Sequence, residues 1–516
     1  MLRRSSLPLD MLALEPGGDI PMHRQLYAGL RAQILEGRLR AGSRLPASRT
    51  LAQELGVGRN TVIAAYDALL AEGYLEARSG SGTWVADLPQ EAVAARGKAP
   101  PRGHPALSAR GQLMASQGRH RTNPGQIAFH PGYPETATFP FSTWARLLAR
   151  HARRPGEDLF GYHYVAGHPR LREAIADYLG ISRGVECSPD QVIVLGGAQA
   201  ALDLVARMLT DPGDTVWVED PGYSGARSAL ACAGAAIESL NVRGGGWDLD
   251  AEGNRPPRLI FVTPSCQWPL GVGMRMEDRL RLLSLAERHD AWIVEDDYDA
   301  EYRFRGRPIP AMQGLDRSGR VIYLGTFAKT LFPSLRLGFV VAPPELVDGF
   351  KRAVNATGHF APLLSQVTLA DFMREGYFST HLKRMRRLYA QRQRRFVGLC
   401  RLHLGRWMRV VENEAGMQVL GRLAPGLDDR AVAAAALRRG VDLLPLSSQY
   451  HHSPPEHGLL LGFAGVGERE TMAGVRALQE AFVEVAHAQR SGSAEISGNG
   501  PSAGSKAPLG SARRAG

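Results

Sequence analysis

Strand-like and helix-like segments alternate along residues 124–488 of this 516-residue chain, and this alternation constrains the fold most. Short apolar runs rich in valine and isoleucine are expected to be strands, and segments with apolar residues at helical spacing lie between them. The pattern predicts an α/β domain with a mostly parallel central sheet that binds ligands at the carboxyl ends of its strands. The predicted strands are 191–195, 215–219, 259–263 and 292–295, and the predicted helices are 199–209 and 279–288.

One lysine stands out, in the stretch VIYLGTFAKTLFPSLRLGFV at 321–340. An apolar, strand-like run ends in Gly-Thr, Lys329 follows, and Arg336 precedes a second apolar run. A lysine at a turn between buried strands loses solvation, which favours its neutral, nucleophilic amine and makes it a candidate covalent anchor for a carbonyl compound or cofactor. The alternative is a solvated loop lysine, which is the commoner case, so the neighbouring motifs decide between the two.

Other motifs supply what a bound cofactor needs. The strand at 291–294 ends in EDDY, and a buried carboxylate there can hold a protonated pyridine nitrogen. The sequence GGAQ at 196–199 joins a strand to a helix N-terminus, which is an anion site, and Thr326 and Arg336 can add a hydroxyl and a guanidinium to the same phosphate. Each feature is weak evidence alone, but a lysine, an acid and a phosphate cradle together indicate pyridoxal 5'-phosphate (PLP).

The N-terminal segment predicts a separate, basic domain. Three helical patterns at 21–37, 44–55 and 59–72 precede a β-ribbon at 74–85, an order typical of a winged helix-turn-helix. Six arginines stand against two glutamates between residues 31 and 59, which favours contact with DNA phosphates. The alternative is a small helical module that binds another protein.

The stretch LPASRTLAQELGVGRNTVIAAYDALLAEGYLEARSGSGTWV resembles the DNA-binding domain of the GntR regulators. In that family the second and third helices and the wing contact DNA. Residues 59–61 would begin the recognition helix, where side chains reach base edges and free backbone N–H groups meet phosphate. Gly58 stands where the family usually has serine, so this helix is expected to lack a side-chain cap. The residues implied to bind DNA are Arg49, Arg59, Asn60, Thr61 and Gly82.

The segment that follows resembles fold-type I aminotransferases, and with the N-terminal domain the chain resembles the MocR subfamily of the GntR family over residues 20–480. The motif GTFAK implies that Lys329 is the Schiff-base lysine. The motif EDDYD implies that Asp296 partners the pyridine nitrogen and that Tyr298 lies near the phenolic oxygen. Phosphate contacts are implied for Ala198, Gln199 and Arg336.

Two tyrosines complete the implied site. Tyr223, in EDPGYSGAR, would stack on the cofactor ring, and its alternative role is that of an ordinary loop aromatic. Tyr162, in GYHYVAG, falls where these enzymes send a tyrosine to the phosphate of the partner subunit. The resemblance therefore implies a homodimer.

Several departures from the family bear on activity. In TPSCQWPLG, Cys266 stands where the subfamily commonly has histidine, and Trp268 replaces an asparagine that many aminotransferases use against the cofactor. Tyr164-Val165 replaces a usual Asp-Pro. The sequence GLLLGF at 458–463 has only leucines where aminotransferases carry an arginine for the substrate carboxylate. The candidates to substitute for that arginine are Arg227 and His451.

These observations predict a PLP-dependent transcriptional regulator that senses PLP, or an amine or amino acid that reacts at Lys329, and thereby changes how a dimer engages operator DNA. One alternative is an active aminotransferase with an accessory DNA-binding domain, but the missing arginine makes transaminase activity weak or absent. Another is a DNA-binding protein whose large domain is only a dimerisation scaffold.

The expected division is a DNA-binding domain at 1–88, a basic flexible linker at 89–123, the PLP-binding domain at 124–488 and a disordered tail at 489–516. The four cysteines are scattered without a C-x-x-C pair, so neither a disulfide framework nor a metal site is indicated. No apolar segment approaches the ~20 residues of a membrane span, and a cytoplasmic protein is expected. The net charge of +11 permits an anionic partner such as DNA.

Overall fold

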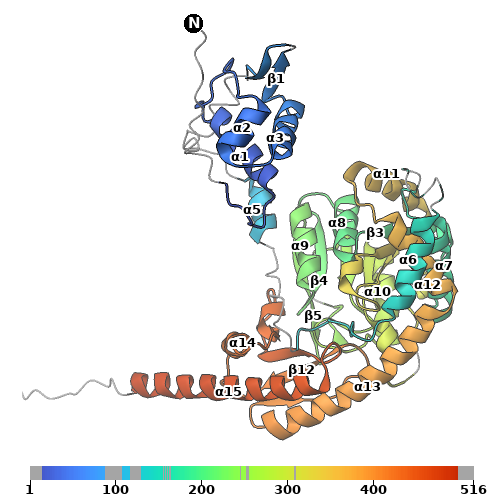
Figure 1. The fold of residues 1–516 in the computed structure, drawn as a ribbon. Helices are drawn as coiled ribbons and strands as arrows, with labels where there is room; N and C mark the ends of the chain where they lie inside the picture. Colours follow the sequence, from blue (N-terminus) through green and yellow to red (C-terminus); the bar gives the residue numbers. More distant parts are fainter. Residues whose placement is uncertain are drawn as a thin grey trace, which may run out of the picture. The chain divides into compact units, whose positions relative to one another are not determined.

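The computed structural model describes residues 14–78, 80–87, 107–116, 129–154, 156, 159, 161, 164–244, 246–250, 255–306 and 309–497, without the side chains after residue 488. The chain divides into two compact units, Met1–Leu107 and Ser108–Gly516, each with its own core (Figure 1). No helix in the described part of the chain is both long and apolar enough to cross a membrane.

The first unit is a winged helix-turn-helix, as the sequence predicts. Three helices precede a two-stranded antiparallel ribbon whose register pairs Arg78 with Gly82. Apolar side chains at helical spacing, among them Leu26, Leu30 and Val62, are fully buried between the helices and the ribbon. The elements are α1 (Met22–Leu35), α2 (Ser48–Leu55), α3 (Arg59–Ala71), β1 (Leu75–Arg78) and β2 (Gly82–Val85).

An eight-stranded sheet organises the second unit, in the order β3-β10-β9-β8-β7-β4-β5-β6. The strands are β3 (Val192–Leu195), β4 (Thr215–Asp220), β5 (Ala236–Arg243), β6 (Gly246–Trp247), β7 (Leu259–Val262), β8 (Trp292–Asp297), β9 (Val321–Thr326) and β10 (Gly338–Val341). Strands β9, β8, β7, β4 and β5 run parallel, whereas β10 and β6 are antiparallel to their neighbours. The predicted mostly parallel sheet is therefore confirmed.

Helices cover both faces of this sheet, because its central strands are apolar on both faces (Figure 1). They are α6 (Phe141–Arg153), α7 (Pro169–Arg183), α8 (Ala198–Leu209), α9 (Ser224–Ala233), α10 (Met276–Arg288), α11 (Val347–Thr357), α12 (Leu363–Arg374) and α13 (Tyr377–Leu404). Ile193 and Leu195 of β3 face α8, α9 and α11, while Val192 and Val194 face α6, α7, α12 and α13. Helix α10 packs against β7 and β8 in a further cluster.

A second, antiparallel sheet lies in the C-terminal part, in the order β11-β12-β14-β13. Its elements and their helices are β11 (Met408–Val410), β12 (Gln418–Leu423), α14 (Asp429–Leu437), β13 (Leu444–Pro445), β14 (Gly458–Gly462) and α15 (Glu468–Ser497). Side chains alternate along β14, so Leu459 and Leu461 enter the core shared with α15. Leu460 faces the other way and joins a separate cluster with Trp268.

Two boundaries differ from the prediction. Inside the segment expected to be a flexible linker, α5 (Ala109–Ser116) is a helix that packs against α9. Its eight residues are too few to show a helical period within a stretch rich in Ala, Arg, Gly and Pro. Helix α15 continues to Ser497, into the expected tail. Residues 89–106, 117–123 and 498–516 of the two segments lie outside the described residues.

Candidate cofactor and DNA-binding sites

The carboxyl ends of four neighbouring strands bring the predicted cofactor residues together. Tyr223 follows β4, Trp268 follows β7, Asp296 lies at the end of β8, and Lys329 follows β9. These four strands are adjacent and parallel, so their carboxyl ends share one edge of the sheet. Ligands of open α/β sheets bind at this edge.

Lys329 is half-buried, and its Nζ donates a hydrogen bond to the carbonyl oxygen of Gly132 at 2.8 Å. A Cβ on Gly132 would lie 2.7 Å from Nζ, and Gly132 has a φ of +72°, so a glycine is needed for this approach. The backbone next to Gly132 is held by β14, because the N–H of Gly462 donates to the carbonyl oxygen of Phe129 at 2.8 Å. Sequence reasoning missed Gly132, since it lies 197 residues from the lysine it contacts.

Asp296 is buried, and its Oδ1 has no hydrogen-bond partner among the described residues. Burial raises the pKa of its carboxyl to about 7; Asp297 and Glu219 act in the same direction, and Lys329 opposes them. A buried carboxylate with an unused oxygen suits a cationic N–H donor. The protonated pyridine nitrogen of PLP is such a donor, so the residue present fits that cofactor.

Partners that sequence reasoning did not find hold the acidic end of β8. Asp297 Oδ2 accepts hydrogen bonds from Arg183 Nε and Tyr323 Oη, each at 2.7 Å, and Arg183 Nη2 reaches Ser265 Oγ at 2.7 Å. Arg183 and Asp297 are both buried, so this ion pair compensates the charge of Asp297 inside the protein. Asp296 has no arginine of this kind, which leaves it for a ligand. No spacing signal in the sequence joins α7, β8 and β9 in this way.

Aromatic side chains surround the same edge. Tyr298 Oη donates to the carbonyl oxygen of Cys266 at 2.8 Å, and burial raises the pKa of the phenol well above its usual value. Tyr223 immediately precedes α9, and a Cβ on Gly225 would lie 2.5 Å from its ring, so Gly225 leaves room for that ring. Trp268 contacts both tyrosines edge to face, with ring centroids 6.3 Å and 6.1 Å apart.

The start of α8 is an open anion site. Gly197 is its N-cap with a φ of +105°, and no side chain caps the helix. The backbone N–H groups of Ala198 and Gln199 at the first turn are therefore available to a ligand. Arg336 is exposed and has no hydrogen-bond partner among the described residues, and its guanidinium carbon lies 3.9 Å from where a Cβ on Gly197 would stand. These features fit a phosphate group.

A cavity of about 440 Å³ adjoins this anion site. It extends from Arg336 and Gln199 to Met114 of α5, and its other walls come from α8 and α9. Thr326 is buried at the end of β9, where its Oγ1 accepts a hydrogen bond from the N–H of Ala328 at 3.2 Å. Tyr162 lies outside the described residues, so its placement stays a prediction.

Of the two candidates for carboxylate binding, the guanidinium of Arg227 is engaged elsewhere, and His451 is held through its backbone. Arg227 Nη1 donates to the carbonyl oxygens of Gln449, at 2.7 Å, and Gly222, at 3.5 Å, and burial lowers the pKa of the guanidinium. His451 donates its backbone N–H to Asp220 at 2.9 Å. Burial lowers the pKa of the His451 imidazole, which favours the neutral ring. Both residues belong to the junction of the large sheet with the C-terminal part of the chain.

In the first unit, the predicted DNA-contacting residues lie at the surface. The N-cap of α3 is Gly58, which provides no side-chain cap, as the sequence predicts. The N–H of Thr61 donates to the carbonyl oxygen of Gly58 at 3.0 Å, which leaves the N–H groups of Arg59 and Asn60 for a phosphate. Four of the five predicted residues are exposed and one, Thr61, is partly exposed: Arg49, Arg59, Asn60, Thr61 and Gly82.

Two arginines lie beside the ribbon, Arg44 before α2 and Arg78 at the end of β1. Gly82 begins β2 with a φ of +98°, and a Cβ there would lie 3.1 Å from Arg44 Nε. The guanidinium carbons of Arg44 and Arg78 lie 5.9 Å and 5.0 Å from the ring centre of Trp84. The tryptophan therefore orders two arginines beside the turn of the wing.

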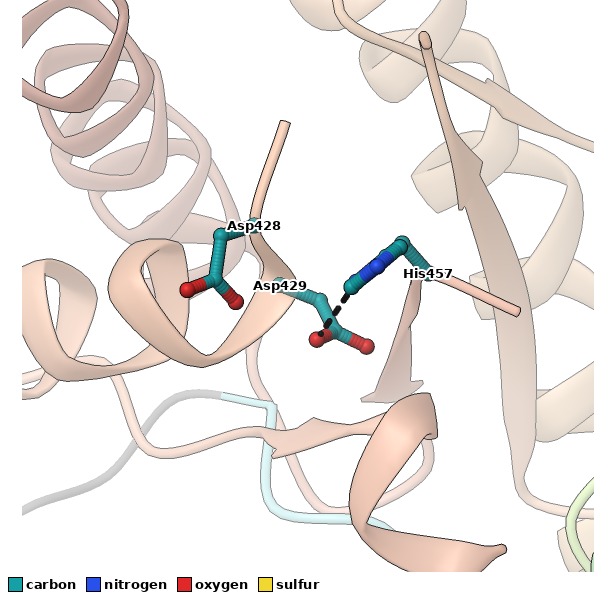
Figure 2. A group of neighbouring side chains, drawn as sticks. All are labelled: Asp428, Asp429 and His457. Atoms are coloured by element: carbon teal, nitrogen blue, oxygen red, sulfur yellow. Dashed lines mark hydrogen bonds and ion pairs between the residues drawn. The ribbon is translucent and has the colours of Figure 1, made fainter. Parts of the chain in front are cut away.

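One group of side chains has the composition of a metal site, namely Asp428, Asp429 and His457 (Figure 2). The buried Asp429 carboxylate accepts four hydrogen bonds, from the N–H and Oγ of Ser447, the N–H of Gly458 and the Nδ1 of His457. The Asp428 carboxylate accepts from the N–H of Arg430 at 2.9 Å and caps α14. These donors occupy the carboxylate oxygens that a metal would need, so the group is a structural joint between α14 and β14.

Two family models match the chain: aminotransferase class I and II, over residues 132–458, and bacterial regulatory proteins of the gntR family, over residues 22–85. The chain is 63% identical over 473 residues to the probable rhizopine catabolism regulatory protein MocR of Rhizobium meliloti, with 92% of this chain and 96% of that protein covered. It is 35% identical over 396 residues to the HTH-type transcriptional regulator TauR of Rhodobacter capsulatus, with 75% and 81% covered.

A solved structure has a similar fold over the second unit. It is LysN, the α-aminoadipate aminotransferase of Thermus thermophilus, in complex with N-(5'-phosphopyridoxyl)-L-leucine. The TM-score is 0.65 at 30% identity, and the match covers 70% of this chain and 93% of that one. The predicted fold-type I aminotransferase architecture is confirmed by this likeness.

Proposed function

This chain belongs to the MocR subfamily of the GntR regulators, and on that premise we propose that it is a transcriptional regulator whose second unit holds PLP. It senses PLP itself, or an amine or amino acid that takes the place of Lys329 on the cofactor, and it changes operator binding in response. The observation that carries the proposal is Asp296, which is buried beside Lys329 with an unused carboxylate oxygen.

Each residue at this edge of the sheet would contact a different part of the cofactor. Lys329 would provide the amine that binds the cofactor covalently, and it lies half-buried at this edge of the sheet. Asp296 would bind the protonated ring nitrogen, which makes the ring an electron sink when the cofactor is present. Tyr223 would stack on the ring, and Tyr298 would lie near the phenolic oxygen. The phosphate would be held by Ala198, Gln199, Thr326 and Arg336, together with Tyr162 of the second copy in a homodimer.

The first unit binds double-stranded DNA. Arg59, Asn60 and Thr61 begin α3 and read base edges in the major groove, while Arg49 on α2 binds the backbone. Gly82 leaves room for the guanidinium of Arg44 beside the wing. A homodimer would present two such units to a two-part operator, in the cytoplasm where the DNA lies.

Helix α5 provides a route between the two activities. It begins two residues after the first unit ends, and its Met114 lines the cavity beside the anion site. Arg110 of the same helix acts electrostatically on Cys232 of α9. A phosphate in the anion site changes the charge of this cavity, and α5 is the element of its wall nearest in sequence to the DNA-binding unit.

The test is operator binding by the full chain, with an operator obtained by in vitro selection. PLP and candidate amines should change the affinity or the footprint, and Lys329→Ala should abolish the change. The matched control is Lys351→Ala, which removes a lysine of α11 outside this edge of the sheet. Identical affinity and footprint under all conditions would refute the proposal.

An active aminotransferase is the second candidate, favoured by the pairing of Lys329 with Asp296 and by the likeness to LysN. The apolar character of Trp268 and Leu460 counts against efficient turnover of amino acids. Rapid conversion of the bound cofactor to its amine form in a single turnover would favour this candidate over the sensor.

A further inference from the structure

An apolar wall closes the sheet edge that carries Lys329. Trp268 from the large sheet and three leucines from the C-terminal part form one buried cluster, and three tyrosines pack against it. The leucines are Leu420, Leu446 and Leu460, and the tyrosines are Tyr223, Tyr298 and Tyr450. Because Tyr223, Trp268 and Tyr298 follow the ends of β4, β7 and β8, next to Lys329 after β9, a ligand that reaches Lys329 meets this wall.

Side chains alternate along β14, and this alternation directs Leu460 toward the apolar wall. It is fully buried against Trp268, while its neighbours Leu459 and Leu461 point into the opposite core. The same strand reaches the lysine, because Gly462 holds the segment that ends at Gly132. Two separate contacts therefore place Leu460 and Lys329 in the same region. One is the packing of Leu460 on Trp268, and the other is the hydrogen bond from Gly462 to the segment that ends at Gly132.

The polar groups next to the apolar wall form hydrogen bonds with one another. Trp268 Nε1 donates to the side-chain oxygen of Gln449 at 3.1 Å, and Arg227 donates to the backbone oxygen of the same residue at 2.7 Å. The guanidinium of Arg227 therefore binds a backbone oxygen and is not a partner for a ligand at the apolar wall. An anionic group placed against Leu460 and Trp268 would lose its water without gaining a cationic partner.

We propose that the ligand sensed at Lys329 is a primary amine that has no carboxylate on the carbon bearing the amine. The inference rests on the proposed function, and it assigns selection against amino acids to Leu460 and Trp268. In the exchange, the ligand nitrogen takes the double bond to the cofactor carbon that Lys329 Nζ gives up. Two protons pass from the ligand nitrogen to Nζ, and no electrons are gained or lost.

The test compares two ligands that differ only by the carboxylate. The PLP-loaded full chain is titrated with 3-methylbutylamine and with L-leucine, and the change in the absorption band of the lysine-bound cofactor is followed. The amine should act at a concentration about 100-fold lower, because an unpaired buried carboxylate is strongly disfavoured. Equal potency of the two ligands, or a preference for leucine, would overturn the inference.

Two variants test whether Leu460 sets the preference for the amine over leucine. Leu460→Arg should raise the apparent affinity for leucine at least about 10-fold, because it supplies a bidentate partner for the carboxylate. The matched control, Leu461→Met, changes the same strand on its opposite face and should keep the preference for the amine. If Leu460→Arg does not fold, the wild-type ratio of the two ligands still decides the matter.

The readout separates this inference from the proposed function. A wild-type chain with no lysine-bound absorption band, or with a band that Lys329→Ala retains, would contradict cofactor capture itself. A normal band that leucine shifts as readily as the amine does would contradict only the assignment of the ligand class.

Discussion

Replacing Asp296 with asparagine should make the cofactor-free protein more stable at high pH. The wild-type carboxyl has a pKa raised by burial from 3.8 to about 7. An acid with a raised pKa in the folded state contributes stability that is fully present below the unfolded value and is lost as the pH rises through the folded value. The loss therefore falls between about pH 4 and pH 7. Asparagine keeps the size of the side chain and has no proton to lose in this range.

The magnitude follows from the two pKa values. Each pH unit between them lowers the free energy of unfolding by about 1.4 kcal/mol, so the full interval amounts to about 4 kcal/mol for this one group. Glu219, Glu295 and Glu301 also have pKa values raised to about 7 by burial. They therefore lower the free energy of unfolding with rising pH in both wild type and variant. The difference between wild type and variant isolates Asp296 from this shared background.

The assay is urea unfolding of the cofactor-free full chain at a series of pH values. Wild type and Asp296→Asn should be similar near pH 4 and diverge by up to about 4 kcal/mol near pH 8, with the variant more stable. The control is Asp348→Asn, whose side chain is 80% exposed on α11. Curves for wild type and Asp296→Asn that stay parallel from pH 4 to pH 8 would refute the reasoning. Added PLP should reverse the order near pH 8, since its cationic ring nitrogen stabilises only the ionised carboxylate.

Three further outcomes are expected. Arg336→Ala should weaken PLP binding ~10- to 100-fold and leave pyridoxal binding unchanged, because only PLP has the phosphate; equal losses for both would contradict the phosphate role. Arg59→Ala should weaken specific operator binding by ~1 to 3 kcal/mol in fluorescence anisotropy if it reads a base, and unchanged affinity would remove that assignment. Asp429→Ala should lower the free energy of unfolding by ~2 to 4 kcal/mol, because four donors lose their acceptor, whereas a chelator should leave the unfolding midpoint unchanged. A drop caused by the chelator would instead make Asp429 a metal ligand.

The fold was predictable from the sequence where apolar residues repeat over several turns or strands. Helices α1 and α3 and strands β4, β7 and β8 lie within a few residues of their predicted bounds, because each is long or apolar enough to show its period. Helix α5 was missed because eight residues in a linker-like composition show no period. It lies against α9, and this tertiary contact leaves no local pattern in the sequence.

The candidate-site residues that lie within a single local sequence motif were predictable. Lys329 and Asp296 follow or end neighbouring parallel strands, so recognising the strands was enough to expect them together. Gly132 and Arg183 were not predictable, because their partners lie in segments far away along the chain. Gly132 needs the C-terminal sheet to reach Lys329, and Arg183 needs α7 to lie over the end of β8. Such contacts are set by the assembled fold and leave no local pattern.

The structure separates the groups that would hold the cofactor from the groups that would choose the ligand. The first set is charged or polar and comes from the large sheet: Lys329, Asp296, the start of α8 and Arg336. The second set is apolar and comes partly from the C-terminal sheet, with Leu460 at its centre. A change at Leu460 should therefore alter which amine acts without altering PLP affinity, whereas a change at Arg336 should do the reverse.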